Sequence, residues 1–124
     1  MAYKPDGYTD LAPYLLVKDA EAVLAFCETV FAATRLRVVP NESGGIMHAE
    51  CRIGDTVLMM GEADAPPAML HLYMEDPDAA FERAVAHGAE IIQPMMEKGD
   101  GDRRGGVRSS DGTQWFLARQ VESG

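Results

Sequence analysis

The sequence predicts an α+β fold made of two copies of one β-α-β-β-β module, and three observations lead to this prediction. The segment at residues 14–22 lines up with the segment at residues 71–79, an offset of 57 residues. At the same offset, residues 54–56 line up with residues 111–113. The expected helices and strands then follow one another in the same order in both halves. A repeated unit packs against its copy to bury its apolar face, so we expect a pocket at the seam between the copies.

The first module, about residues 9–62, begins with a short strand and a capped helix. Residues 10–17 are mostly apolar but contain Pro13, as is typical of a strand near a sheet edge. Asp19 is expected to cap a helix of about three turns. The apolar residues at helical spacing in this helix are Ala22, Val23, Phe26, Val30 and Phe31. Three strands are expected to follow, at residues 34–39, 46–53 and 56–60.

The second module, about residues 68–120, repeats this order after a stiff Pro66-Pro67 connector. A strand is expected at residues 69–74, followed by a helix that Asp76 caps and that Pro77 begins, where a missing N–H is harmless. Gly88 is expected to end this helix. The remaining expected segments are a strand at residues 89–93, a long polar loop at 94–104, and strands at 105–108 and 113–118.

Composition and charge exclude several classes of protein. The chain has 124 residues, 47% of them hydrophobic and 25% charged, which is ordinary for one globular domain over residues 1–124. No apolar run approaches the roughly 20 residues of a membrane span, so we expect no membrane partner. A net charge of -9 without a basic stripe argues against nucleic acid, although it attracts cationic small molecules. The beginning of the chain has no secretory signal pattern, and we therefore expect a cytoplasmic protein.

Several segments carry the likeness of a known family. They are residues 47–50 leading into 52–55, Leu70-His71-Leu72-Tyr73, and residues 101–108 with Asp111-Gly112. The sequence resembles the vicinal oxygen chelate superfamily of glyoxalase I, bleomycin and fosfomycin resistance proteins and extradiol dioxygenases. The likeness is strongest to its small bacterial branch labelled demethylubiquinone methyltransferase-like. The resemblance implies two tandem βαβββ modules forming curved mixed sheets around a cavity, and a homodimer.

The resemblance also indicates where a metal would bind. In the metal-dependent members, His and Glu ligands from the first and last strands of each module hold a divalent ion. Those positions map here onto Ala12, Met59, Met69 and Phe116. None of these side chains offers the imidazole or carboxylate donors that Zn, Ni or Fe(II) sites need. We therefore expect no metal and no cofactor, with a divalent metal as the alternative.

The same positions predict an apolar ligand pocket with a few polar groups. Tyr14 and His71 lie two residues after the mapped positions and so project from the same strand faces. The expected lining residues are Tyr14, His48, Glu50, Met59, Met69, His71, Arg103, Trp115 and Phe116. Such a lining suits an organic ligand with an aromatic or aliphatic body. The alternative is that the apolar members simply form the core.

Two polar groups leave further alternatives open. His48 and Glu50 share one strand face, where they form an acid-base pair, a displaced metal set with His71, or only an exposed polar face or a dimer-interface pair. Arg103 or Arg104 either binds a carboxylate or phosphonate of the ligand or fixes its own loop through Asp100 or Asp102.

We therefore expect a metal-free protein that binds a small organic, cationic ligand in an apolar cleft. The second hypothesis is a lyase, isomerase or dioxygenase of the same superfamily that uses His48, Glu50 and His71 with a metal, or a metal-independent acid-base catalyst. The third is a dimeric interaction module whose cavity its own side chains fill. The absence of a nucleophile elbow, P-loop or dinucleotide motif argues against covalent hydrolysis and nucleotide chemistry.

Overall fold

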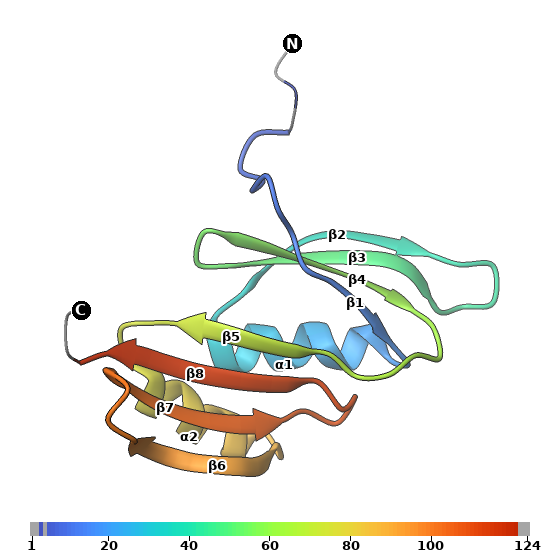
Figure 1. Cartoon of the computed structure of the whole chain (residues 1–124). Helices are drawn as coiled ribbons and strands as arrows, with labels where there is room; N and C mark the ends of the chain where they lie inside the picture. Colours follow the sequence, from blue (N-terminus) through green and yellow to red (C-terminus); the bar gives the residue numbers. More distant parts are fainter. Residues whose placement is uncertain (1–2, 4, 122–124) are drawn as a thin grey trace. The chain divides into compact units, whose positions relative to one another are not determined.

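A computed structural model describes residue 3 and residues 5–121 of the chain. The chain divides into two compact units, residues 1–66 and residues 67–124. The division falls between Pro66 and Pro67, within the predicted connector. Each unit consists of one helix and one four-stranded mixed sheet, so the α+β class and the repeated order of elements are confirmed (Figure 1).

The first unit pairs its first strand with its last. Its elements are β1 (Tyr14–Val17), α1 (Ala20–Phe31), β2 (Thr34–Pro40), β3 (Ile46–Ile53) and β4 (Thr56–Glu62). The sheet order is β1-β4-β3-β2, in which β1 runs parallel to β4 and the other neighbours are antiparallel. Helix α1 is the crossover that a parallel pair requires, and it covers one face of this sheet (Figure 1).

The second unit has the same topology. Its elements are β5 (Met69–Tyr73), α2 (Pro77–Ala86), β6 (Glu90–Glu97), β7 (Asp102–Arg108) and β8 (Gln114–Gln120). The sheet order is β5-β8-β7-β6, with β5 parallel to β8 and the other pairs antiparallel. Helix α2 packs on one face of the sheet, mainly against β7. In both units we call the sheet face opposite the helix the helix-free face.

The predicted helix starts are confirmed. The side chain of Asp19 accepts a hydrogen bond from the backbone N–H of Ala22 at 3.1 Å, and Asp76 accepts one from Ala79 at 3.1 Å. Each carboxylate satisfies an N–H group that has no partner within the helix. Gly88, with φ of 103°, follows the end of α2 as predicted.

The core of the first unit lies between α1 and the sheet. Because side chains alternate along a strand, every second residue of β1, β3 and β4 faces the helix. The buried apolar residues between these elements include Leu15, Val23, Leu24, Cys27, Val30, Ala49, Cys51, Leu58 and Met60. The intervening strand residues point to the helix-free face, where the candidate site is found.

The structure corrects the predicted bounds of the loop at residues 94–104 and of the first strand. Strand β6 continues to Glu97 and β7 begins at Asp102, so the loop predicted at residues 94–104 shrinks to four residues. Pro94 does not stop β6 because β6 is an edge strand and its register shifts between Gln93 and Met96. The first strand begins at Tyr14 instead of residue 10, although the backbone oxygen of Pro13 still accepts a hydrogen bond from Met59 of β4.

Neither of the two helices in the described part of the chain is long or apolar enough to cross a bilayer.

Candidate functional site

The helix-free face of the first sheet brings four of the predicted site residues together. Tyr14 is the register partner of Met59, and Met59 is the partner of Glu50, so the three form one row across β1, β4 and β3. His48 lies two residues before Glu50 and shares its face. Leu16 shares the face of Tyr14 and is 48% exposed. This face therefore combines apolar side chains with an imidazole and a carboxylate.

Four polar side chains on this face form a continuous hydrogen-bonded series, which we call the Glu50 chain. The Tyr8 hydroxyl donates to Glu50 Oε1 at 2.5 Å. Glu50 Oε2 lies 2.7 Å from His48 Nε2. His48 Nδ1 in turn lies 3.1 Å from the Tyr14 hydroxyl. The chain thus runs from the segment before β1 to Tyr14, which is 49% exposed.

Glu50 is a buried carboxylate that remains ionised. Only 4% of the residue is exposed, and burial alone would raise its pKa. Hydrogen bonds from His48 and Tyr8 outweigh burial, with help from the charge of Arg37, so the pKa of Glu50 lies below its ordinary value. The pKa of Tyr8 is raised, chiefly because its hydroxyl donates to this carboxylate. Glu50 therefore carries a negative charge at neutral pH.

Gly61 on β4 provides the space in which Tyr14 lies. A Cβ atom at this position would be 2.9 Å from the Tyr14 hydroxyl and 2.9 Å from the backbone oxygen of Met47. Real Cβ atoms essentially never show contacts this short. The missing side chain allows the Tyr14 ring to lie close to the sheet with its hydroxyl beside His48.

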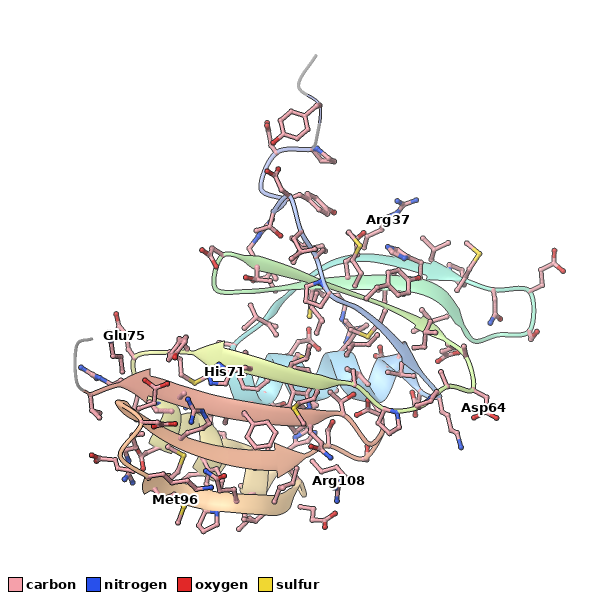
Figure 2. The ribbon with its side chains drawn as sticks, in the orientation of Figure 1. Arg37, Asp64, His71, Glu75, Met96 and Arg108 are labelled. Carbon is pink, nitrogen blue, oxygen red and sulfur yellow. The ribbon has the colours of Figure 1, made fainter. Side chains whose placement is uncertain are left out.

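The helix-free face of the second sheet carries three other predicted residues. His71 is the register partner of Phe116, and Phe116 is the partner of Gly106. Met69 lies two residues before His71 on the same face and is 66% exposed. The Phe116 ring lies over Gly106, where a Cβ atom would be 2.7 Å from it. Figure 2 shows His71 among the side chains of this unit and Arg37 on β2 of the first unit.

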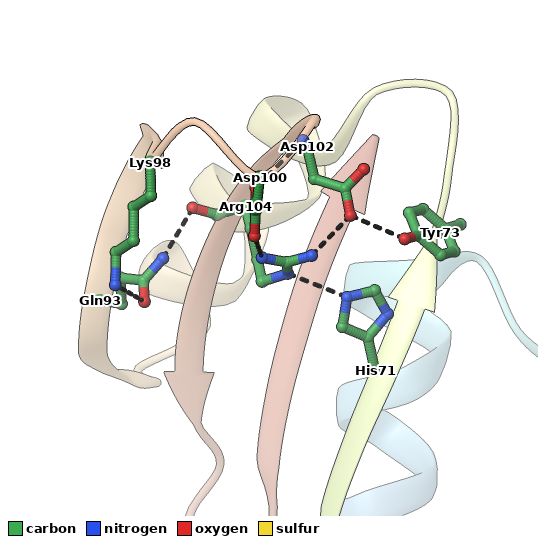
Figure 3. A network of polar contacts seen from close by, with 7 residues as sticks. All are labelled: His71, Tyr73, Gln93, Lys98, Asp100, Asp102 and Arg104. Atoms are coloured by element: carbon green, nitrogen blue, oxygen red, sulfur yellow. Dashed lines mark hydrogen bonds and ion pairs between the residues drawn. The ribbon is translucent and has the colours of Figure 1, made fainter. Parts of the chain in front are cut away.

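Arg104 organises the polar groups of this second face (Figure 3). Its Nε donates to His71 Nε2 at 2.9 Å. Its two terminal nitrogens donate to Asp100 at 2.8 Å and to Asp102 at 2.5 Å. The Tyr73 hydroxyl also donates to Asp102, at 2.7 Å. The guanidinium charge is therefore compensated by two carboxylates while one N–H fixes the imidazole.

His71 is held in its neutral form. Burial lowers its pKa, the Arg104 charge lowers it further, and Asp102 opposes the shift only in part. Since Nε2 accepts the Arg104 N–H, the ring proton must be on Nδ1. His71 and Tyr14 occupy equivalent registers in the two sheets, and each is hydrogen-bonded to the third strand of its own sheet.

Arg103 and Trp115 lie on the other face of the second sheet. Arg103 forms a bidentate ion pair with Asp78 of α2, with its shortest contact at 2.7 Å. Trp115 is fully buried, and its indole N–H donates to Ser109 at 2.8 Å. These two predicted lining residues therefore face the helix side, whereas Phe116, next to Trp115, faces the opposite side. Strand alternation separates them.

The comparison with known proteins identifies the family. Residues 8–117 match the sequence model of the Glyoxalase/Bleomycin resistance protein/Dioxygenase superfamily. The chain belongs to this superfamily. An uncharacterized protein of Mycobacterium bovis is 32% identical, and the alignment covers 90% of this chain and 83% of the relative. A relative from Mycobacterium tuberculosis H37Rv is also 32% identical, with 90% of this chain and 74% of the relative covered.

Two solved structures illustrate the fold that this chain shares with known proteins. TioX from Micromonospora sp. ML1 superposes with a TM-score of 0.79 at 25% identity, covering 91% of this chain and 99% of TioX. The fosfomycin resistance protein FosX of Listeria monocytogenes gives a TM-score of 0.70 at 19% identity, covering 91% of this chain and 93% of FosX. At this level of identity, the similarity to FosX shows a shared fold and nothing about activity.

The side chains at the positions that the sequence resemblance maps onto metal ligands do not fit a divalent cation. Ala12 and Met59 in the first unit, and Met69 and Phe116 in the second, present a methyl group, thioethers and a phenyl ring. Within residue 3 and residues 5–121, no group of three His, Cys, Asp or Glu side chains is placed to hold a metal.

Sequence reasoning missed some residues of both networks. Tyr8 donates to a carboxylate 42 positions away, and no local pattern indicates this contact. Tyr73 lies two residues after His71 on the same strand face, so alternation offered a signal for it. The prediction that an arginine pairs with Asp100 or Asp102 applies to Arg104, which contacts both.

Proposed function

We propose that this glyoxalase-superfamily protein binds a small organic ligand without a metal, in an apolar cleft that includes the helix-free face of the first sheet. The observation that carries the proposal is that large side chains with apolar bodies remain exposed at a hydrogen-bonded polar series whose carboxylate is buried. Leu16 is 48% exposed next to the Glu50 chain, and Tyr14, the last member of that chain, is 49% exposed. Ligand sites combine such apolar lining with a few fixed polar groups.

The second unit offers a similar surface of its own. Met69 and Tyr73 are 66% and 65% exposed on its helix-free face, beside the neutral imidazole of His71. Thioether and aromatic side chains adapt to varied apolar ligands. Neither unit therefore presents a purely polar sheet face.

We propose that the ligand is cationic. The chain carries a net charge of -9, and the Glu50 carboxylate is ionised on the proposed face. A negative field raises the local concentration of cationic molecules. The Arg104 guanidinium does not offset this preference in the second unit because Asp100 and Asp102 pair with it.

We further propose sequestration of the ligand by a cytoplasmic homodimer, in the manner that the name bleomycin resistance protein suggests for part of the superfamily. We also propose, from the sequence resemblance, membership of the small bacterial branch labelled demethylubiquinone methyltransferase-like. The proposal does not include methyl transfer, because the sequence has no glycine-rich cofactor loop after a strand.

An enzymatic role is the second candidate. Glu50, His48 and Tyr14 are spaced as a carboxylate, a base and a hydroxyl are in acid-base sites, at 2.7 Å and 3.1 Å. A metal-dependent lyase, isomerase or dioxygenase would instead need His48, Glu50 and His71 as ligands. In that case His71 would have to give up the bond that its Nε2 accepts from Arg104.

A thermal-shift panel of aromatic and cationic compounds tests the binding proposal. A ligand that binds only the folded state raises stability by RT ln(1 + [L]/Kd), about 2.7 kcal/mol at a concentration of 100 Kd. Leu16→Gln should reduce the shift. Val85→Gln, at a 39% exposed position on α2, is the matched control and should not. If no compound shifts the melting temperature, the interaction module becomes the better account.

A further inference from the structure

The donors and acceptors along the Glu50 chain follow from the ionised carboxylate of Glu50. An ionised carboxylate only accepts hydrogen bonds. Tyr8 donates its hydroxyl proton to Glu50 Oε1, and His48 Nε2 lies 2.7 Å from Oε2. His48 must therefore carry a proton on Nε2 and donate it to Glu50. For a neutral His48 this fixes the tautomer of the ring, because a neutral imidazole has only one N–H.

The direction continues to Tyr14. With its proton on Nε2, neutral His48 has a lone pair on Nδ1, which lies 3.1 Å from the Tyr14 hydroxyl. The hydroxyl supplies the only proton available for this contact, so Tyr14 donates to His48. Its proton is then directed toward His48, and the remaining lone pairs of its oxygen are free to accept. Tyr14 is 49% exposed, so a ligand can reach that oxygen.

We infer that the Tyr14 hydroxyl is the hydrogen-bond acceptor that selects the ligand, and that the ligand carries an N–H or O–H donor beside its apolar body. This inference rests on the proposed binding function and narrows it. A primary or secondary ammonium group satisfies both the negative field and the acceptor. A quaternary ammonium group satisfies only the field, and a carboxylate satisfies neither.

The second unit indicates that the hydrogen-bond partner on the third strand of the sheet decides whether the side chain on the first strand accepts or donates. The register equivalent of Tyr14 is His71, and its partner Arg104 can only donate. His71 therefore accepts through Nε2 and retains an N–H on Nδ1. One arrangement of backbone thus yields an acceptor at the end of the Glu50 chain and a donor at the equivalent position of the second sheet.

The test compares two cationic probes by isothermal titration at neutral pH. They are 2-naphthylmethylammonium and its N,N,N-trimethyl analogue, which have the same charge and ring but differ in N–H donors. A single neutral acceptor corresponds to a roughly three- to tenfold tighter binding of the primary ammonium. Tyr14→Phe should reduce the ratio of the two affinities to about one. Tyr3→Phe, which replaces a tyrosine that is not part of the Glu50 chain, should leave this ratio unchanged.

Glu50→Gln tests the direction itself. The Gln amide can donate to His48 Nε2 and thereby favour the tautomer with a proton on Nδ1, which makes the Tyr14 hydroxyl an outward donor. The ratio between the two probes should fall even though Tyr14 is intact. Nitrogen-15 NMR of the imidazole should show Nε2 protonated in the wild type and Nδ1 protonated in the variant.

The outcomes separate this inference from the binding proposal. Equal binding of both probes would overturn the inference and leave metal-free binding of cations in place. Binding of neither probe would count against a cationic ligand, and NMR then decides the inference. A wild-type His48 protonated on Nδ1 at neutral pH overturns it, and one protonated only on Nε2 supports it.

Discussion

Replacing Tyr8 with Phe should destabilise the first unit by removing one of the two hydrogen bonds that Glu50 receives. The lost bond is a 2.5 Å contact to a carboxylate that is only 4% exposed, so water cannot readily replace the hydroxyl. Hydrogen bonds to charged groups contribute about 1.5–3 kcal/mol. We expect a loss of about 2 kcal/mol, which corresponds to roughly 8 °C in melting temperature for a chain of this size.

Urea unfolding monitored by circular dichroism measures this loss, and Tyr3→Phe is the matched control. Tyr3 also donates to a carboxylate, that of Asp10, but it is 83% exposed, so its replacement should have little effect. The pKa of Glu50 should also rise in Tyr8→Phe, because a bond that lowers it is gone. Equal unfolding midpoints for the two variants would refute the claim that Glu50 is a buried carboxylate stabilised in its ionised form by the hydrogen bonds that it accepts.

Three further predictions follow from the two sheet faces. Gly61→Ala places a Cβ atom 2.9 Å from the backbone oxygen of Met47, so urea unfolding should show a loss of about 1–3 kcal/mol, and the NMR signals of the His48 ring should shift. Arg103→Ala breaks the ion pair with Asp78 on the helix side of the sheet and should leave the ligand-induced thermal shifts unchanged. A smaller shift in this variant would indicate that Arg103 contributes to the ligand site. Because the folded pKa of His71 is lowered, the unfolded chain binds a proton first as pH falls below about 6.5. Wild type should therefore lose stability relative to His71→Gln between about pH 7 and pH 5, and parallel pH profiles would contradict this.

The fold was largely predictable because local signals agreed with the repeat. Asp19 and Asp76 marked both helix starts, and the order of strands followed from turn residues and alternation. Pro94 misled the prediction because proline is permitted on an edge strand, and the sequence does not reveal which strand lies at the edge. The end of α1 at Ala32, in a left-handed conformation with φ of 55°, also lacked the usual glycine signal.

The candidate site was predictable only where side chains belong to one strand. His48 and Glu50 are two residues apart, so their shared face followed from the strand period. Trp115 and Phe116 are adjacent, and only the observed register separates the core residue from the residue on the helix-free face. The contact of Tyr8 with Glu50 depends on tertiary structure that no local pattern encodes.

Metal analysis of protein purified without chelator tests the central claim most directly. The account predicts Ni, Zn, Mn and Fe far below one equivalent per chain in both wild type and His48→Ala, and the wild-type protein purified in this way should still show ligand-induced thermal shifts. A stoichiometric metal that is lost in His48→Ala would contradict it and establish a metal-dependent member of the superfamily.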